Sequence, residues 1–446
     1  MFVDGVSLRE AFPIHEIELP ALLLYGAATV AFFLYYLWRY LHKGVFSFDS
    51  YFVIMSLYIP IVFMFPFAFS RMNSVLATGA FHDVYVAYLH EAFYIGMFGI
   101  ALFAVGALAA RFSRLRLVGL GVMSQSFRKF WITRLGVAIS IAVILLLLVM
   151  MIGLGFEIGN ARATSMARPS LRPLYNVFHT LLPFVAVSSF VYAYKRAWAF
   201  YPIGVLVALL GAFGGTRSTS IGPLISFAII VMIVTKYRNF FPLVLLASVV
   251  LPLAVYLGGI RHGIYDLSQV SSVPVILLYG NNFSDLRDFA WILSGWDHAL
   301  LHGRTQVAGF LSFIPSSLSE FRSTWAWGNF STTTAGLADI SGHAGLRPPF
   351  FGEFYFNYGL PGVAISSFVT GFVVFKLTAY VHQATERYRA KEAVVDVFAA
   401  MVYLSLFKAF LITAGFFAFH ITVLLILAGM IVLAAVRRHR LTLSHA

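Results

Sequence analysis

The segment at residues 214–220 combines residue types that suit the binding of an anion. It reads GGTRSTS and places Arg217 among two glycines and four hydroxyl-bearing residues. Glycines let the backbone approach a ligand closely, hydroxyl groups donate hydrogen bonds, and a guanidinium grips phosphate oxygens through two N–H groups at once. The segment therefore predicts a diphosphate site. The alternative is an interfacial arginine whose long side chain carries its charge to the lipid headgroups.

A second arginine has similar surroundings. Arg261 follows the paired glycines Gly258 and Gly259, so it is a candidate for a second cationic contact with the same kind of ligand. Lys408 stands inside an apolar run, and an ionisable group at such a depth usually faces a cavity or a partner. Alternatively, the Lys408 side chain extends to the nearer membrane surface.

Groups suited to proton transfer cluster between residues 339 and 353. An alcohol nucleophile needs a base to take its proton, and a leaving diphosphate needs cations. His343 can accept a proton near neutral pH, whereas Asp339 or Glu353 would need desolvation to do so. Arg347 supplies a cation in the same stretch. We therefore expect a catalytic base among these three residues, with an ordinary surface ion pair to Arg347 as the alternative.

Aromatic residues in the same region suggest contacts with sugars. Trp325 and Trp327 flank Ala326 in a polar segment, and an indole ring offers a flat surface on which a sugar ring can rest. Trp291 and Trp296 are instead typical of the aromatic belt at a membrane interface.

Membrane-spanning helices must position these residues. Of the 446 residues, 60% are apolar and 11% are charged, whereas about a quarter of the residues in soluble domains are charged, so a soluble enzyme is excluded. Eleven apolar runs are long enough to cross about 30 Å of hydrocarbon as helices. They cover residues 19–38, 50–69, 92–110, 135–155, 176–194, 197–214, 219–235, 240–259, 355–375, 393–413 and 416–436. The predicted fold is an all-α polytopic membrane protein.

The basic residues orient this helix bundle. Nineteen Lys and Arg residues flank alternate ends of the runs and mark the cytoplasmic face, which puts the N-terminus outside and the C-terminus inside. All eleven basic residues at the opposite face are arginines, as expected of phosphate binding, although biased residue usage is an alternative. The net charge of +13 then follows from topology, and a nucleic-acid partner loses its main support.

The chain divides into three predicted regions. Residues 1–259 form a bundle of eight helices, residues 260–352 form a large outer loop, and residues 353–446 contribute three further helices. Apolar runs at 273–279 and 310–314, punctuated by Gly and Pro, predict short interfacial helices in the loop. The sequence contains neither a glycine-rich phosphate loop nor HExxH spacing, and it has no cysteine, so we predict no metal and no other cofactor.

The layout and several motifs resemble the Wzy-type O-antigen and exopolysaccharide repeat-unit polymerases, with the related O-antigen ligases close behind. The resemblance covers the number of spans, one dominant outer loop before the last helices, and three short motifs. These are GGTRS at 214–218, Gly303 with GFLSFIP at 309–315, and EFYFNYG at 353–359. Arg217 matches the turn arginine thought to hold diphosphate in that family, and Arg261, Arg322 and Arg347 are analogues by position.

The resemblance implies a GT-C-like enzyme at the periplasmic face of the bacterial inner membrane. Its reaction would be an inverting, metal-independent glycosyl transfer in which the growing glycan leaves undecaprenyl diphosphate and joins a hydroxyl of the incoming repeat unit. Donor and acceptor would both be undecaprenyl-diphosphate-linked oligosaccharides, with membrane lipids, a chain-length regulator and a flippase as further partners. An O-antigen ligase acting on lipid A-core, a transporter of lipid-linked oligosaccharides and a non-catalytic assembly protein remain alternatives.

Overall fold

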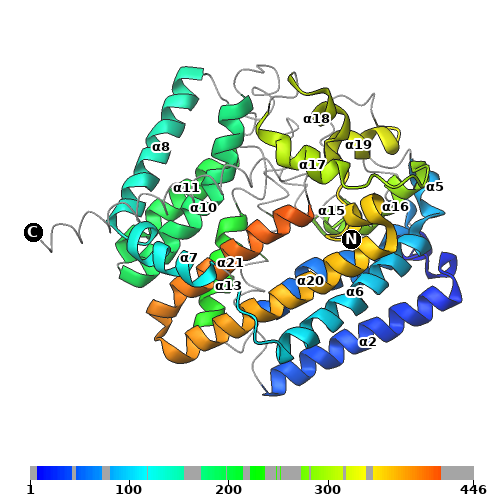
Figure 1. Ribbon diagram of the computed structural model, residues 1–446, viewed down its shortest axis with the longest axis horizontal. Helices are drawn as coiled ribbons and strands as arrows, with labels where there is room; N and C mark the ends of the chain where they lie inside the picture. Colours follow the sequence, from blue (N-terminus) through cyan, green and yellow to red (C-terminus); the bar gives the residue numbers. More distant parts are fainter. Residues whose placement is uncertain are drawn as a thin grey trace, which may run out of the picture. The chain divides into compact units, whose positions relative to one another are not determined.

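The computed structural model describes most of the chain. The described residues are 8–42, 47–72, 81–117, 119–154, 172–196, 198–213, 221–236, 273–280, 283–314, 318–337 and 345–412, with residues 248 and 252. Within these ranges every regular element is a helix (Figure 1). This agrees with the predicted all-α fold.

Helices cover nine of the eleven predicted apolar runs, and the runs at 240–259 and 416–436 lie almost wholly outside the described residues. Three helices are long and apolar enough to cross a membrane, namely α2 (Leu19–His42), α6 (Leu89–Phe112) and α20 (Gly352–Arg387). A bent pair, Leu120–Trp131 with Arg134–Leu146, would make a fourth. The chain is thus an all-α protein with helices able to span a membrane, and the number of eleven spans and their orientation stay predictions.

Contacts between Cα atoms divide the chain into two compact units that do not follow the three predicted regions. Unit 1 comprises residues 1–116, 271–378 and 407–417, and unit 2 comprises residues 117–270, 379–406 and 418–446. Unit 1 therefore combines the first helices with most of the predicted outer loop and the first part of α20. The division by membrane topology stays a prediction, because packing and topology are separate properties.

The long helices of unit 1 are α2, α6 and the first part of α20 (Figure 1). Glycines let α6 and α20 approach closely. A Cβ atom added at Gly106 would lie 1.9 Å from the Phe368 carbonyl oxygen, and one added at Gly371 would lie 2.0 Å from that of Phe103. Small residues at helix contacts are typical of packing in membranes, where van der Waals contact replaces the hydrophobic effect between helices.

Shorter helices complete unit 1. The predicted run at 50–69 is a helix with a π-helical centre, η2 (Ile54–Phe63), that contains Pro60 and connects α3 (Phe48–Val53) to α4 (Phe65–Ala68). The predicted outer loop contains short helices, as its sequence indicates. They are α15 (Val273–Tyr279), α16 (Asp285–Gly295), α17 (Arg304–Phe310), α18 (Glu320–Trp325) and α19 (Trp327–Thr334), and α5 (His82–Val86) also belongs to this unit.

Unit 2 is built around α10 (Arg172–Arg196), which packs on α8 (Arg134–Leu154), α11 (Tyr201–Phe213) and α13 (Gly222–Val234). Phe190 lies at the centre of this packing and stacks on Phe227 with ring centroids 5.1 Å apart. The two helices α11 and α13 have 13 residues each, or about 20 Å of helix. They are shorter than the predicted runs at 197–214 and 219–235 on either side of Arg217.

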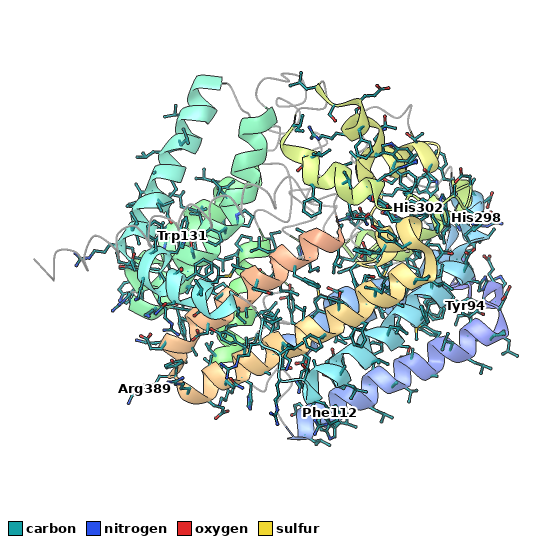
Figure 2. The ribbon with its side chains drawn as sticks, in the orientation of Figure 1. Tyr94, Phe112, Trp131, His298, His302 and Arg389 are labelled. Carbon is teal, nitrogen blue, oxygen red and sulfur yellow. The ribbon has the colours of Figure 1, made fainter. Side chains whose placement is uncertain are left out.

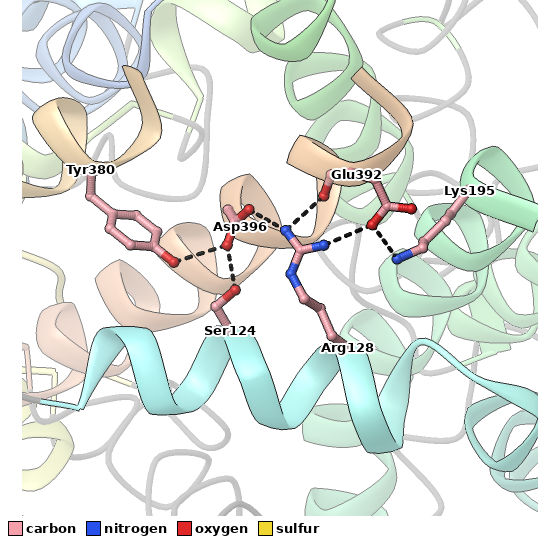
Figure 3. Close-up of polar contacts among 6 residues, drawn as sticks. All are labelled: Ser124, Arg128, Lys195, Tyr380, Glu392 and Asp396. Carbon is pink, nitrogen blue, oxygen red and sulfur yellow. Dashed lines mark hydrogen bonds and ion pairs between the residues drawn. The ribbon is translucent and has the colours of Figure 1, made fainter. Parts of the chain in front are cut away.

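An ionic cluster joins four segments of unit 2, namely α7 with η5, α10, the last part of α20, and α21 (Figure 3). Arg128 lies in the π-helical turn η5 (Phe127–Trp131), which follows α7 (Leu120–Ser126), and it pairs with Glu392 at 2.8 Å and with Asp396, both in α21 (Ala390–Leu411). Lys195 at the end of α10 shares Glu392 at 2.8 Å. Asp396 also accepts hydrogen bonds from Ser124 and from Tyr380. These basic residues were predicted only to orient the chain, but in the fold they also connect helices.

Candidate functional site

Four of the predicted site residues lie outside the described residues. They are Arg217, Arg261, Asp339 and His343. The other six, Glu353, Arg347, Arg322, Lys408, Trp325 and Trp327, all belong to unit 1.

Glu353 lies in a buried polar cluster at the start of α20. Its side chain accepts a hydrogen bond from the Thr305 hydroxyl at 2.7 Å, and the Asn357 side chain donates to the same hydroxyl oxygen at 2.8 Å. Asn357 also accepts from the backbone N–H of Gly303 at 2.9 Å. This cluster joins the Gly303 segment to the EFYFNYG segment, so two of the motifs behind the family resemblance are in direct contact.

The burial of Glu353 changes its expected role. The residue is 1% exposed, and Thr305 and Asn357 are fully buried beside it. A general base must come within hydrogen-bond reach of the substrate, and in this conformation protein atoms surround the carboxylate. The structure therefore favours a positioning role, in which Glu353 fixes the first turn of α17 against α20.

Asn357 also holds a sharp turn between α16 and α17. Its backbone carbonyl accepts the N–H of His302 at 3.0 Å. His302 and Gly303 both have positive φ angles, 50° and 83°, a backbone conformation that is unusual for a residue with a side chain. Figure 2 shows His298 and His302 in this turn, where the earlier His298 also has a positive φ of 61°.

The tryptophans differ from the sequence-based interpretation. Trp327 is 2% exposed, and its indole N–H donates to the Leu346 carbonyl at 2.9 Å, so it is a core residue and no open sugar platform. Trp291 and Trp296 are also buried, at 1% and 8% exposure, so they belong to the core of unit 1 and form no interfacial belt. Trp325 is half-buried, and the Arg304 guanidinium carbon lies 4.5 Å from its ring centroid.

Arg322 is held by its own loop. Its guanidinium donates to the backbone carbonyl of Ile314, and burial lowers its pKa. This contact explains how Arg322 is fixed, and it leaves the predicted binding of a substrate anion untested.

Charged groups from three distant parts of the sequence meet at the start of α16. Asp288 accepts the backbone N–H of Arg347 at 3.1 Å. Asp285 interacts electrostatically with Arg347, with Asp288 and with Lys408. Arg347 is exposed and Asp285 is half-buried, so a ligand can reach this cluster. The structure thus brings two predicted substrate-binding residues, Arg347 and Lys408, to a carboxyl group that the sequence analysis had passed over.

Desolvation raises the pKa of Asp285 from 3.8 to about 7. The positive charges of Arg347 and Lys408 lower the pKa, and the neighbouring Asp288 raises it, so burial outweighs the attraction of both cations. A carboxylate with a pKa near 7 is well matched to general base catalysis at neutral pH. The only signal for Asp285 in the sequence was its spacing from a second carboxylate. Asp285 and Asp288 lie three residues apart in a loop that is otherwise largely aromatic and apolar.

Lys408 also contacts residues outside the Asp285 cluster. Its ammonium donates to the Ser56 hydroxyl at 3.2 Å and lies 5.6 Å from the centroid of the Phe52 ring. Phe52 in turn contacts Phe350, with ring centroids 6.0 Å apart, just after the Arg347 segment. These contacts give the cation partners within the protein, as expected of an ionisable group in an apolar helix.

No group of three His, Asp or Glu side chains suited to a metal ion occurs among the described residues. Comparison of the chain with protein-family models, with curated proteins and with solved structures finds no match. Inference about function therefore depends on the residues themselves.

Proposed function

We propose that this protein is a membrane glycosyltransferase that polymerises undecaprenyl-diphosphate-linked oligosaccharide repeat units at the periplasmic face of the bacterial inner membrane. One observation carries the proposal: a carboxyl group of raised pKa, Asp285, lies among the cations Arg347 and Lys408. Transfer from a lipid diphosphate needs a base for the acceptor hydroxyl and cations for the leaving group, and this cluster contains both. Helices able to span a membrane suit a lipid-linked substrate.

The reaction assigns a role to each group. The acceptor hydroxyl oxygen attacks the anomeric carbon of the growing glycan while the bond from that carbon to the diphosphate oxygen breaks. The hydroxyl proton passes to Asp285, and the negative charge that develops on the diphosphate is stabilised by Arg347 and Lys408. Attack opposite the leaving group inverts the anomeric configuration. Glu353 positions the first turn of α17 and takes no proton.

His343 and Asp339 remain alternative bases in this mechanism. Both belong to the segment that leads to Arg347, and an imidazole needs no desolvation to accept a proton near neutral pH. Arg217 and Arg261, which lie outside the described residues, stay proposed diphosphate contacts on the strength of the sequence, and Arg322 is a further proposed cation.

Reconstitution tests the proposal. The purified chain in proteoliposomes receives undecaprenyl-diphosphate-linked repeat units, and gel electrophoresis follows the glycan length. We expect a ladder of polymers still attached to undecaprenyl diphosphate. Arg347→Gln and Arg217→Lys should abolish the ladder, because the first removes a charge and the second removes the two-point grip of a guanidinium. Lys129→Arg is the matched control and should leave the ladder unchanged, since either cation orients a helix equally well.

The same assay separates the alternatives. A ligase would make no ladder but would move single repeat units to added lipid A-core. A transporter would make no new glycosidic bond and would change only the side of the membrane on which the substrate is found. A ladder of normal length from Arg347→Gln would contradict the assigned role of the cluster.

A further inference from the structure

Basic side chains from η5 and α10 surround Glu392 at the start of α21. Arg128 and Lys195 each pair with its carboxylate at 2.8 Å, as Figure 3 shows, and Arg196 also interacts with it electrostatically. Desolvation by itself would raise the pKa of Glu392, but the hydrogen bond from Lys195 and the charges of the three cations lower it. Positive charge therefore outweighs the carboxylate at this point of unit 2.

Further cations extend this positive region. Six basic residues lie in the cluster or close to its members in the sequence, and we call them the basic surface: Arg128, Lys129, Lys195, Arg196, Arg389 and Lys391. The carboxylates among them are Glu392 and Asp396, so six positive and two negative charges leave a net charge of +4. Lys129, Arg389 and Lys391 are exposed and belong to no ion pair in the described part of the chain. This surplus of charge suits an anionic partner.

Helix α8 begins directly after η5 and has a long exposed apolar face. Leu135, Ile141, Leu145 and Val149 are between 43% and 64% exposed, while another side of the helix packs on α10. Leu135 and Val149 are fourteen positions apart, or about 21 Å along a helix. One leaflet of a bilayer contributes about 15 Å of hydrocarbon, so this face is long enough to hold an acyl chain.

A sharp bend separates the basic surface from the apolar face of α8. The segments Leu120–Trp131 and Arg134–Leu146 are inclined by 74° to each other, and Figure 1 shows α7 at one end of α8. With 21 residues, α8 is about 31 Å long, enough to cross the hydrocarbon of a bilayer. In a bilayer crossed by α8, α7 and η5 therefore lie nearly parallel to the surface, with Lys129 and the exposed Arg134 on the two sides of the bend.

An exposed tryptophan lies next to the same cations in the sequence. Trp198 is 81% exposed and follows Arg196 by two residues. Indole rings are enriched where lipid headgroups meet hydrocarbon. A partner that fits exposed cations, an exposed indole and an apolar helix face must itself have an anionic and an apolar part. A phospholipid has both, whereas an acidic segment of a soluble protein matches the cations alone.

We propose that the basic surface and the exposed face of α8 bind an anionic phospholipid, with its phosphate at Lys129 and Arg134 and an acyl chain along α8. Lys and Arg near a membrane surface attract anionic headgroups, and the attraction grows with each added cation. The bound lipid would hold α7 and η5 against the membrane at the bend. The proposal does not depend on glycosyl transfer, since it uses only charge, exposure and helix geometry.

Quenching of tryptophan fluorescence by brominated lipids tests the site. The full chain is reconstituted in phosphatidylcholine bilayers that contain, at equal mole fraction, either brominated phosphatidylglycerol or brominated phosphatidylcholine. Comparison with Trp198→Phe gives the quenching of Trp198 alone. We expect phosphatidylglycerol to bind beside Trp198 at least about fivefold more tightly, which is the effect of one basic residue near an anionic surface. Salt at about 1 M should reduce this preference, because it screens exposed charges.

Variants then assign the preference to residues. Lys129→Gln combined with Arg134→Gln should abolish it, whereas Lys129→Arg combined with Arg134→Lys keeps both charges and should preserve it. The matched control, Arg111→Gln combined with Arg114→Gln, removes the same charge from exposed positions at and just after the end of α6 in unit 1, and should also preserve it. All four positions are exposed, so the helix content measured by circular dichroism should stay unchanged.

Several results would overturn the lipid site. Equal quenching of Trp198 by the two lipids in the unmodified protein is the first, and a preference that survives the loss of Lys129 and Arg134 is the second. Loss of the preference in the Arg111 and Arg114 control would assign it to the overall charge of the chain. A preference unchanged by 1 M salt would contradict the role of charge without any variant. Polyglutamate that binds the chain, in the absence of any lipid preference, would assign the basic surface to an acidic protein segment.

Discussion

Replacing Asp285 with asparagine should remove activity and at the same time stabilise the protein above neutral pH. Asparagine has nearly the same shape as aspartate but never ionises. Burial raises the pKa of Asp285 from 3.8 to about 7, so the folded protein binds this proton more tightly than the unfolded chain does. The contribution of Asp285 to stability is therefore fully present below pH 3.8 and is lost as the pH rises through about 7.

The pKa shift sets the size of the effect. Each pH unit between the unfolded and folded pKa corresponds to about 1.4 kcal/mol, so ionised Asp285 destabilises the folded state at pH 8 by up to about 4 kcal/mol. Asp285→Asn should recover much of this free energy at pH 8 and almost none at pH 4. Its effect on turnover should be a loss of about a hundredfold or more, as expected when a general base is removed.

Thermal unfolding of both proteins in nanodiscs, followed by intrinsic fluorescence at pH 4, 6 and 8, measures the stability difference. Polymerisation rates at the same lipid-linked substrate concentration measure turnover, and the unmodified enzyme should lose activity tenfold per pH unit below about 7. Equal melting temperatures for Asp285→Asn and the parent protein at pH 8 would refute the desolvation argument. A stabilised variant with full turnover would leave Asp285 without a catalytic role and return the base to His343 or Asp339.

Further predictions concern positioning, packing and metal. Glu353→Gln should keep most of the turnover and an unchanged pH profile, because the amide oxygen still accepts the hydroxyl hydrogen bond, and a hundredfold loss in the rate assay would mean that the carboxylate is the base. Asp396→Asn should lower stability by about 3 kcal/mol by weakening a nearly buried ion pair, whereas Glu386→Gln, 55% exposed, should leave the melting temperature unchanged. Gly371→Ala should destabilise the packing of α6 on α20 by about 1 to 3 kcal/mol, and Gly26→Ala, with open space around it, serves as its control in the same melting experiment. Polymerisation should continue in excess EDTA, since arginines and a lysine neutralise the diphosphate; activity that only Mg²⁺ or Mn²⁺ restores would contradict this.

The sequence predicted the helices well because helix formation in an apolar run is a local property. Runs of the right length became helices at α2, α6, α8, α10, α20 and α21. Glycine and proline predicted the interruptions of the outer segment, where α15 covers residues 273–279 as expected. Charge alone singled out Lys408 and Arg347 as unusual, because neither sits where topology would place an ordinary orienting cation.

The sequence could not show which residues become neighbours in the folded protein. Residues 285, 347 and 408 lie far apart along the chain, and nothing in their spacing shows that one carboxyl group interacts with both cations. Glu353 and Trp327 looked available for substrate, yet the packing of α17 and α19 on α20 buries them. The same packing determines which pKa values change, because desolvation depends on all atoms within several ångströms.

The sequence by itself thus determined the kind of protein, an all-α chain with helices suited to a membrane, since composition and periodicity act within each helix. Only the tertiary structure decided which polar groups converge. It joined the Thr305, Glu353 and Asn357 side chains into a buried cluster and brought the Arg304 guanidinium carbon to 4.5 Å from the Trp325 ring centroid. The physical reason is that such contacts depend on how the helices pack. Small residues such as Gly106 and Gly371 allow close packing only where α6 and α20 meet, and the sequence of one helix does not show which helix it meets.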